Sequence, residues 1–210
     1  MCGRYAATRR PEDLVVEFEA VRAEGQQPLP ADYNVAPTKD VSVGNRLLNA
    51  RVESLTEKPA FRSAARSRRC LVPADGWYEW QKRLDSPGKQ PFFITPADGS
   101  VLAMAGLYEV WGKGEDRLYT CTVVTAPATG ALTEIHDRMP LVLPRERWAD
   151  WLDPARDDVE ALTEPTPPWV VEGLELRPVA TAVNNVRNNG AELLTRVEGT
   201  SAPADQPALF

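Results

Sequence analysis

The sequence is poor in the residues that build most metal sites and disulfide frameworks. Its 210 residues include one histidine and three cysteines. The cysteines are odd in number and lie far apart, at positions 2, 70 and 121, which is typical of a reducing compartment. Structural zinc sites usually bring closely spaced pairs of ligands, and the sequence offers no such pair. We therefore expect no metal and no other cofactor.

A long apolar run is also missing. No stretch approaches the length that spans a bilayer, and the first twenty residues carry charges where a signal peptide would need an apolar segment. We therefore expect a cytoplasmic protein that does not contact the membrane. With 43% hydrophobic and 26% charged residues, the chain is long enough to bury a core as one domain over residues 1–210, which we expect to be a monomer.

Positive charge is in the minority. The formal net charge of −6 argues against a surface coated in basic residues that grips duplex DNA. A local basic groove stays open, because the stretch FRSAARSRRC (61–70) concentrates four arginines. Such clusters are most often solvated helix faces, so this one does not by itself indicate nucleic-acid binding.

Helical and strand patterns are both present. PEDLVVEFEAV, from Pro11, has apolar residues at helical spacing and predicts an amphipathic helix. After Cys70, short apolar runs predict strands, with a hairpin turn at ADG (97–99). RERWADWL and ARDDVEALTE predict short helices, and LELRPVA a further strand. Because no βαβ rhythm occurs, we predict an α+β fold with a mostly antiparallel, barrel-like β core and flanking short helices.

The opening stretch MCGRYA places Cys2 directly behind the initiator methionine. Aminopeptidase removal of Met1 would leave a thiol beside an α-amine, whose pKa near 8 keeps part of it neutral at physiological pH. This pair can attack an aldehyde to give a Schiff base, which the thiolate closes into a thiazolidine ring. Chance placement of Cys2 at the start site is the alternative. The two other cysteines lie in apolar runs and are expected to be buried small hydrophobic residues.

Three further positions are candidates for polar chemistry. His136, in EIHDRMP, is the one side chain that normally titrates near neutrality, although a lone histidine is more often structural. Glu79 lies among aromatic residues in PADGWYEW, where burial would raise its pKa; the alternative is a glutamate facing water. Asn49, Arg51 and Glu53 alternate in LLNARVE and would share one face of a strand, which could also be the wet side of a sheet.

Taken together, MCGRYA, YNVAPT, NARVES, RCLVPADGWYEW and IHDRMP resemble the SOS-response-associated peptidase (SRAP) family, which includes the HMCES-type abasic-site shields. VNNVRNNGAELL (183–194) is similar to the closing segment of that family. The resemblance implies a protein that senses abasic sites in single-stranded DNA and crosslinks to them as a thiazolidine, shielding the lesion. It also implies a peptidase activity that removes residues before the cysteine, and leaves a lyase activity open.

The resemblance further implies roles for individual residues. Cys2 matches the crosslinking residue and Asn49 the active-site asparagine. Glu79 matches the family's glutamate and His136 its histidine. His136 would open the abasic sugar to its aldehyde, and Glu79 would deliver a proton to the departing hydroxide. Seven more residues match positions that face the DNA or the pocket: Gly3, Arg4, Asn34, Pro37, Arg51, Thr125 and Arg138.

One departure from the family pattern lies between YNVAPT and NAR. Family members carry a few dozen residues there, whereas PTKDVSVGNRLLNAR runs almost directly across. The abrupt join near Val41 and Ser42 favours a disordered segment that is missing from this sequence over a true deletion.

Two other functions stay open at this point. MCG also begins class II glutamine amidotransferases, in which an N-terminal cysteine attacks an amide. The polar residues could instead belong to a non-covalent module that binds single-stranded DNA.

Overall fold

The computed structural model describes residues 3–21, 30–36, 48–83, 87–114 and 117–198. The strands are β1 (Arg4–Ala7), β2 (Asp32–Val35), β3 (Asn49–Arg51), β4 (Arg69–Ala74), β5 (Gly76–Lys82), β6 (Lys89–Pro96), β7 (Leu102–Trp111), β8 (Leu118–Pro127), β9 (Arg138–Pro140) and β10 (Leu174–Pro178). The α-helices are α1 (Pro11–Glu17), α2 (Pro59–Ser67), α3 (Trp148–Leu152), α4 (Val159–Leu162) and α5 (Pro168–Glu172). Short 3-10 helices are η1 (Val52–Ser54), η3 (Gly130–Glu134), η4 (Arg145–Arg147), η5 (Thr181–Asn184) and η6 (Ala191–Leu194).

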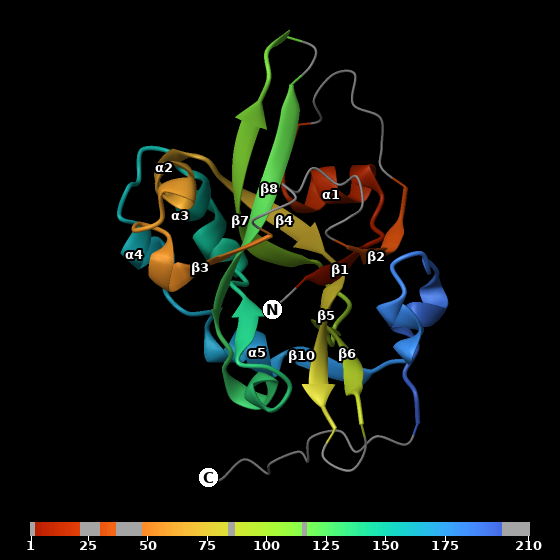
Figure 1. Cartoon of the computed structure of the whole chain (residues 1–210). Helices are drawn as coiled ribbons and strands as arrows, with labels where there is room; N and C mark the ends of the chain where they lie inside the picture. Colours follow the sequence, from red (N-terminus) through yellow and green to blue (C-terminus); the bar gives the residue numbers. More distant parts are fainter. Residues whose placement is uncertain (1–2, 22–29, 37–47, 84–86, 115–116, 199–210) are drawn as a thin grey trace.

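The strands form two five-stranded sheets (Figure 1). The first sheet has the order β10-β6-β5-β1-β2, and the second has the order β3-β8-β7-β4 with β9 also paired to β8. Neighbouring strands are antiparallel except for β3 and β8, which run parallel. The predicted α+β class is confirmed. In the described part of the chain the strands make two open sheets, so the core is not a closed barrel.

The turn at 97–99 joins the two sheets. Gly99 has a φ of 74°, a conformation that glycine adopts without steric cost, so the predicted turn does form. The predicted hairpin is nevertheless wrong, because β6 pairs with β5 and β10 whereas β7 pairs with β4 and β8. Turn residues define where the chain reverses; strand partners depend on which apolar faces can pack together.

The helices follow the sequence prediction with shorter bounds. Helix α1 ends at Glu17, and the next residue, Phe18, stacks its ring on Trp148 at 4.7 Å between centroids. Helices α3 and α4 and strand β10 form where they were predicted. Within the described ranges, no helix is long and apolar enough to cross a membrane.

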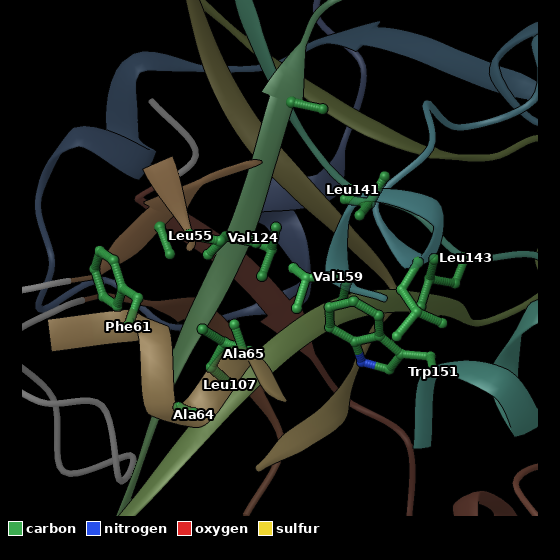
Figure 2. Close-up of a cluster of buried hydrophobic side chains, with 14 residues drawn as sticks. Leu55, Phe61, Ala64, Ala65, Leu107, Val124, Leu141, Leu143, Trp151 and Val159 are labelled. Carbon is green, nitrogen blue, oxygen red and sulfur yellow. The ribbon is translucent and has the colours of Figure 1, made fainter. Parts of the chain in front are cut away.

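The helices cover one face of the second sheet. Side chains of β7 and β8, such as Leu107 and Val124, pack against Phe61 of α2 and Trp151 of α3 (Figure 2). Successive residues of a strand point to opposite faces, so Met104 of β7 packs on the other face, in a cluster that includes Tyr5 of the first sheet. The second sheet is therefore a layer between the helices and the first sheet.

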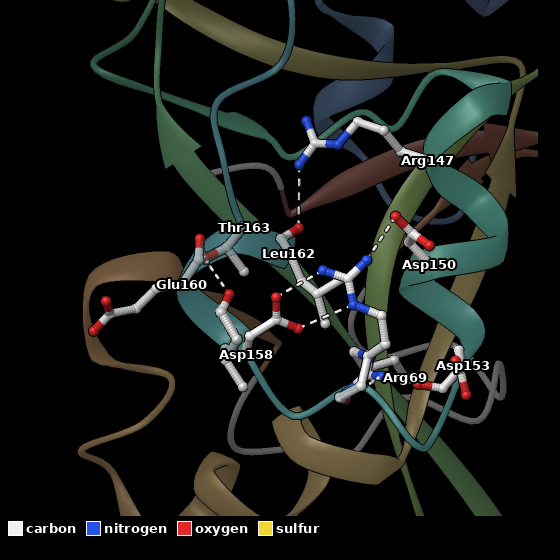
Figure 3. A network of polar contacts seen from close by, with 10 residues as sticks. Arg69, Arg147, Asp150, Asp153, Asp158, Glu160, Leu162 and Thr163 are labelled. Carbon is white, nitrogen blue, oxygen red and sulfur yellow. Dashed lines mark hydrogen bonds and ion pairs between the residues drawn. The ribbon is translucent and has the colours of Figure 1, made fainter.

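Part of the arginine-rich segment is structural. Arg69 is 6% exposed, and its guanidinium donates hydrogen bonds to the backbone carbonyls of Ala65, Arg66, Trp151, Asp153 and Arg156. Arg156 in turn pairs with Asp150 at 2.7 Å and Asp158 at 2.6 Å in the same polar network (Figure 3). Arg69 thus ties α2 to the α3–α4 segment and has no free donor face for a nucleic acid.

Gly76 of β5 allows the first sheet its close packing. A Cβ atom added there would lie 2.4 Å from the Ile94 carbonyl oxygen and 2.6 Å from Cζ of Phe93. We expect Gly76→Ala to lower the free energy of unfolding by about 1–3 kcal/mol, the usual cost of overpacking, measured by urea denaturation. Gly173→Ala is the control, because its added Cβ meets nothing nearer than 3.5 Å. Equal effects of the two substitutions would contradict this account.

Candidate active site

Strand β5 buries a carboxylic acid in the middle of the first sheet. Glu79 lies opposite Phe92 of β6, follows the buried Trp77 and Tyr78, and is itself 3% exposed. The alternative of a glutamate facing water is therefore excluded. Burial raises the pKa of the Glu79 carboxyl, and nearby His136 opposes this shift. Such a group can hold a proton at a higher pH than an ordinary glutamate does.

His136 is the partner that the structure brings to this acid. It lies between η3 and β9, and its Nε2 atom is 4.0 Å from Oε1 of Glu79. The other ring nitrogen, Nδ1, lies 2.9 Å from the backbone nitrogen of Arg138 and 2.8 Å from Oδ1 of Asp137. The two residues predicted to transfer protons thus face each other, although 57 positions separate their numbers in the sequence.

Arg138 and Thr125 lie beside this pair but face inward. The Arg138 side chain is 9% exposed and donates two hydrogen bonds to the carboxylate of Glu53. It also donates to the carbonyl and hydroxyl oxygens of Thr125, at 2.6 and 3.3 Å. The hydrogen bond from Arg138 lowers the pKa of Glu53. The DNA contacts implied for Arg138 and Thr125 stay predictions.

Strand β3 carries Asn49 and Arg51 into the second sheet. It runs beside β8, with Asn49 at the level of Val123 and Arg51 at the level of Thr125. The side-chain oxygen of Asn49 is buried and accepts no hydrogen bond from the described residues, whereas Arg51 is exposed. The predicted alternation through Glu53 is wrong, because the chain leaves the strand after Arg51 and coils into η1.

Arg4 and Asn34 fasten the C-terminal part of the chain to the first sheet. The Arg4 guanidinium donates to the carbonyls of Val183 and Asn184 and lies 5.5 Å from the centre of the Trp80 ring. Asn34 is fully buried, and its Nδ2 atom donates to three backbone carbonyls of the same segment, those of Val183, Asn185 and Asn188. Both side chains are thus engaged within the protein, and their DNA contacts stay predictions.

Three sequence expectations meet the limits of the described residues. Cys2 and Pro37 lie outside them, as does the join near 41–42. Gly3 is described and is half-buried, directly before β1. The next residue, Arg4, pairs with Tyr78, the neighbour of Glu79. Only one residue therefore separates Cys2 from the strand that borders the buried acid.

The two other cysteines belong to the core. Cys70 and Cys121 are partly buried and pack against the cluster that contains Val72 and Val123. Burial raises the pKa of the Cys70 thiol to about 12 and also raises that of Cys121. Neither is a ready thiolate at neutral pH. No group of three or more His, Cys, Asp or Glu side chains that could hold a metal ion occurs among the residues described.

Two residues near the site escaped sequence reasoning. Asp137 contacts the imidazole of His136, and Glu53 holds the guanidinium of Arg138. The signal for Asp137 is only its place beside the histidine in IHDRMP. Glu53 had been expected on a strand face, and its partner lies 85 residues further along the chain.

Fold and site together define a class of protein: an α+β domain in which a buried carboxylic acid and an imidazole can exchange protons. The chain belongs to the SRAP family. The family model described as SOS response associated peptidase (SRAP) matches residues 1–46 and 38–186.

Similar proteins carry a common name. Abasic site processing protein YoaM of Bacillus subtilis is 35% identical over 222 residues, which cover 92% of this chain and 97% of YoaM. Abasic site processing protein YedK of Escherichia coli is 34% identical, covering 94% of this chain and 100% of YedK. Abasic site processing protein HMCES of Xenopus tropicalis is 32% identical, covering 77% of this chain and 55% of HMCES.

Solved structures share the fold. A phage-related protein of Bordetella bronchiseptica is 30% identical with a TM-score of 0.63, covering 85% of this chain and 94% of its own. A protein of Bacteroides thetaiotaomicron is 20% identical with a TM-score of 0.77, covering 93% of this chain and 100% of its own. The second likeness extends the shared fold to most of the chain.

The raised pKa of Glu79 predicts a pH-dependent stability. Since the folded chain holds this proton more tightly than the unfolded chain, ionised Glu79 costs stability above its unfolded pKa of about 4.3. The cost grows as pH rises to the folded pKa. We expect Glu79→Gln, which cannot ionise, to exceed wild type in free energy of unfolding at pH 7, with a gap that shrinks toward pH 4. Urea unfolding at both pH values measures this.

The control for that experiment is Glu134→Gln, which removes an exposed carboxylate of η3. Its effect should stay within about 0.5 kcal/mol at both pH values, as for most surface substitutions. A Glu79→Gln protein that is less stable than wild type at pH 7 would refute the assigned direction.

Proposed function

We propose that this protein processes abasic sites in single-stranded DNA by forming a covalent thiazolidine crosslink through Cys2, after Met1 has been removed. Family membership supports the proposal, as do the abasic site processing proteins of which the chain spans nearly the full length. The observation that carries the mechanism is the buried Glu79 carboxyl 4.0 Å from His136. This pair borders the strand that begins one residue after the cysteine.

The acid and the imidazole suit the first steps of such a reaction. An abasic sugar must open from hemiacetal to aldehyde before an amine can attack it, and ring opening needs one group to give a proton and another to take one. The α-amine of Cys2 then adds to the aldehyde carbon. Glu79, protonated because burial raises its pKa, gives its proton to the leaving hydroxide, and water departs from the resulting Schiff base.

Ring closure completes the crosslink. The thiol of Cys2 adds across the carbon–nitrogen double bond: sulfur joins the sugar carbon and the proton ends on nitrogen. The sum is one thiazolidine and one released water. A cysteine inside the chain cannot follow this route, since its nitrogen is already an amide. In this reaction the buried Asn49 oxygen is placed to accept a hydrogen bond from the attacking amine.

Substrate choice would come from the lesion itself. A normal nucleotide presents no aldehyde, so the chemistry selects the abasic sugar. Exposed Arg51 is available to a DNA phosphate, whereas Arg4 and Arg138 would first have to leave their protein partners. We take the peptidase of the family name to mean removal of what precedes Cys2, and β-elimination at the bound sugar to be the lyase step. We expect a cytoplasmic monomer.

The crosslink is tested with single-stranded DNA that carries one abasic site. Incubation should give an adduct that survives heating in denaturant, with an intact mass equal to protein without Met1 plus DNA minus one water. Cys2→Ala should reduce the adduct at least a hundredfold, because neither amine nor thiol chemistry is then complete. Quantified denaturing gels and mass spectrometry measure both results.

Matched controls come from the chain itself. Cys70→Ala and Cys121→Ala remove thiols whose pKa is raised by burial, and adduct formation should persist in both. If Cys2→Ala forms as much adduct as wild type, the thiazolidine route is refuted. DNA retention without covalent mass would instead support a non-covalent binding module, and glutaminase activity would support an amidohydrolase.

The free terminus itself is the reagent in this proposal. An N-terminal tag that cannot be cleaved should therefore abolish the adduct although Cys2 is present, because the cysteine nitrogen is then an amide. The same tag at the C-terminus serves as the control and should leave the adduct unchanged. Equal adduct yields from the two tagged proteins would contradict the role of the α-amine.

A further inference from the structure

The Nδ1 atom of His136 lies between two groups with opposite requirements. The backbone N–H of Arg138, 2.9 Å away, needs an acceptor. The Oδ1 atom of Asp137, 2.8 Å away, can only accept when ionised. One ring nitrogen cannot satisfy both at once, because it offers either a lone pair or an N–H. The protonation state of the ring therefore decides which partner is bound.

The backbone donor is the more demanding partner. Arg138 begins β9, and its buried side chain is tied to Glu53 and Thr125, so its N–H is held in place. The Asp137 side chain is 84% exposed, and water can solvate its carboxylate. Leaving a shielded N–H without an acceptor costs more than leaving an exposed carboxylate to water. In a neutral ring Nδ1 therefore accepts from Arg138, and the single proton lies on Nε2.

We infer that His136 carries its resting proton on Nε2, directed at Glu79, and takes up its second proton on Nδ1, where Asp137 receives it. Asp137 is then a positioning residue that acts through the imidazole. In the described structure the charged or titratable groups around the ring are Glu79 from β5 and Asp137 and Arg138 from its own segment. Glu53 of η1 meets the guanidinium of Arg138.

This arrangement gives protons a direction through the ring. A solvent proton binds Nδ1 next to exposed Asp137, and the proton on Nε2 passes to the Glu79 carboxylate, so the ring is neutral again. The ring then returns to its resting form by exchanging the Nδ1 proton with solvent and regaining one on Nε2. The result is a reprotonated Glu79 after each use. This last consequence rests on the proposed function; the protonation pattern itself does not.

The chain is well suited to a direct test, because it contains one histidine. The full-length protein, labelled with 15N-histidine and purified without a histidine tag, gives one set of imidazole signals. Long-range 1H–15N correlation spectra separate protonated from unprotonated ring nitrogens. In the neutral ring we expect the proton on Nε2 and the lone pair on Nδ1. A neutral ring with its proton on Nδ1 overturns the inference.

The role of Asp137 is tested in the same spectra. At one mildly acidic pH, Asp137→Asn should lower the ratio of doubly to singly protonated imidazole by about 1.5- to 5-fold, as expected for an exposed ion pair. The difference should shrink as salt is added. Glu134→Gln removes an exposed carboxylate two residues before His136 and is the matched control. An unchanged ratio in Asp137→Asn, or equal changes in both variants, overturns the role of Asp137.

These spectra need neither DNA nor activity, so the two proposals fail separately. Crosslinking by a protein whose neutral ring is protonated on Nδ1 refutes the inference and leaves the proposed function standing. Spectra as expected from a protein that forms no adduct support the protonation pattern while the proposed function fails.

Discussion

A carboxyl group buried in the middle of an aromatic strand is the constraint on which the site depends. Glu79 follows Trp77 and Tyr78 on β5, the strand between β1 and β6. Burial disfavours its charge, so the surrounding fold must supply a group that can share a proton with it. That group, His136, arrives from the other sheet, on the segment between β8 and β9. The site therefore exists only where the two sheets meet.

The contact between the sheets is fixed by polar anchors at their crossing. Asp75, just before β5, accepts hydrogen bonds from the backbone nitrogen and hydroxyl of Thr8 at 2.6 and 2.8 Å and from Arg9 at 2.9 Å. Arg9 also donates to the carbonyl of Gly99 in the turn that leads from the first sheet to the second. The end of β1, the start of β5 and the crossing turn are thus held together, which keeps Glu79 in register with its partner.

Local patterns predicted the elements but not their partners. The mixture of helix and strand, the turn at 97–99 and the burial of Glu79 among aromatic residues all follow from periodicity and composition. The pairing of Arg138 with Glu53 does not, because residues 85 positions apart meet only after both sheets have formed. The failed hairpin has the same origin. Resemblance to a family assembled the site residues beforehand, while their geometry had to come from the structure.

The distribution of charge also separates binding from chemistry. In a chain of net charge −6, Arg4 and Arg138 spend their donors on carbonyls and on Glu53, and Arg51 stays exposed beside Thr125. Each phosphate contact adds to affinity for any DNA and carries no information about a lesion. A surface with few free arginines therefore contributes little affinity for intact strands. Under the proposed function, selectivity then comes from an irreversible or slowly reversed bond to an aldehyde, and weak electrostatic binding becomes an advantage, because the protein is not retained on undamaged DNA.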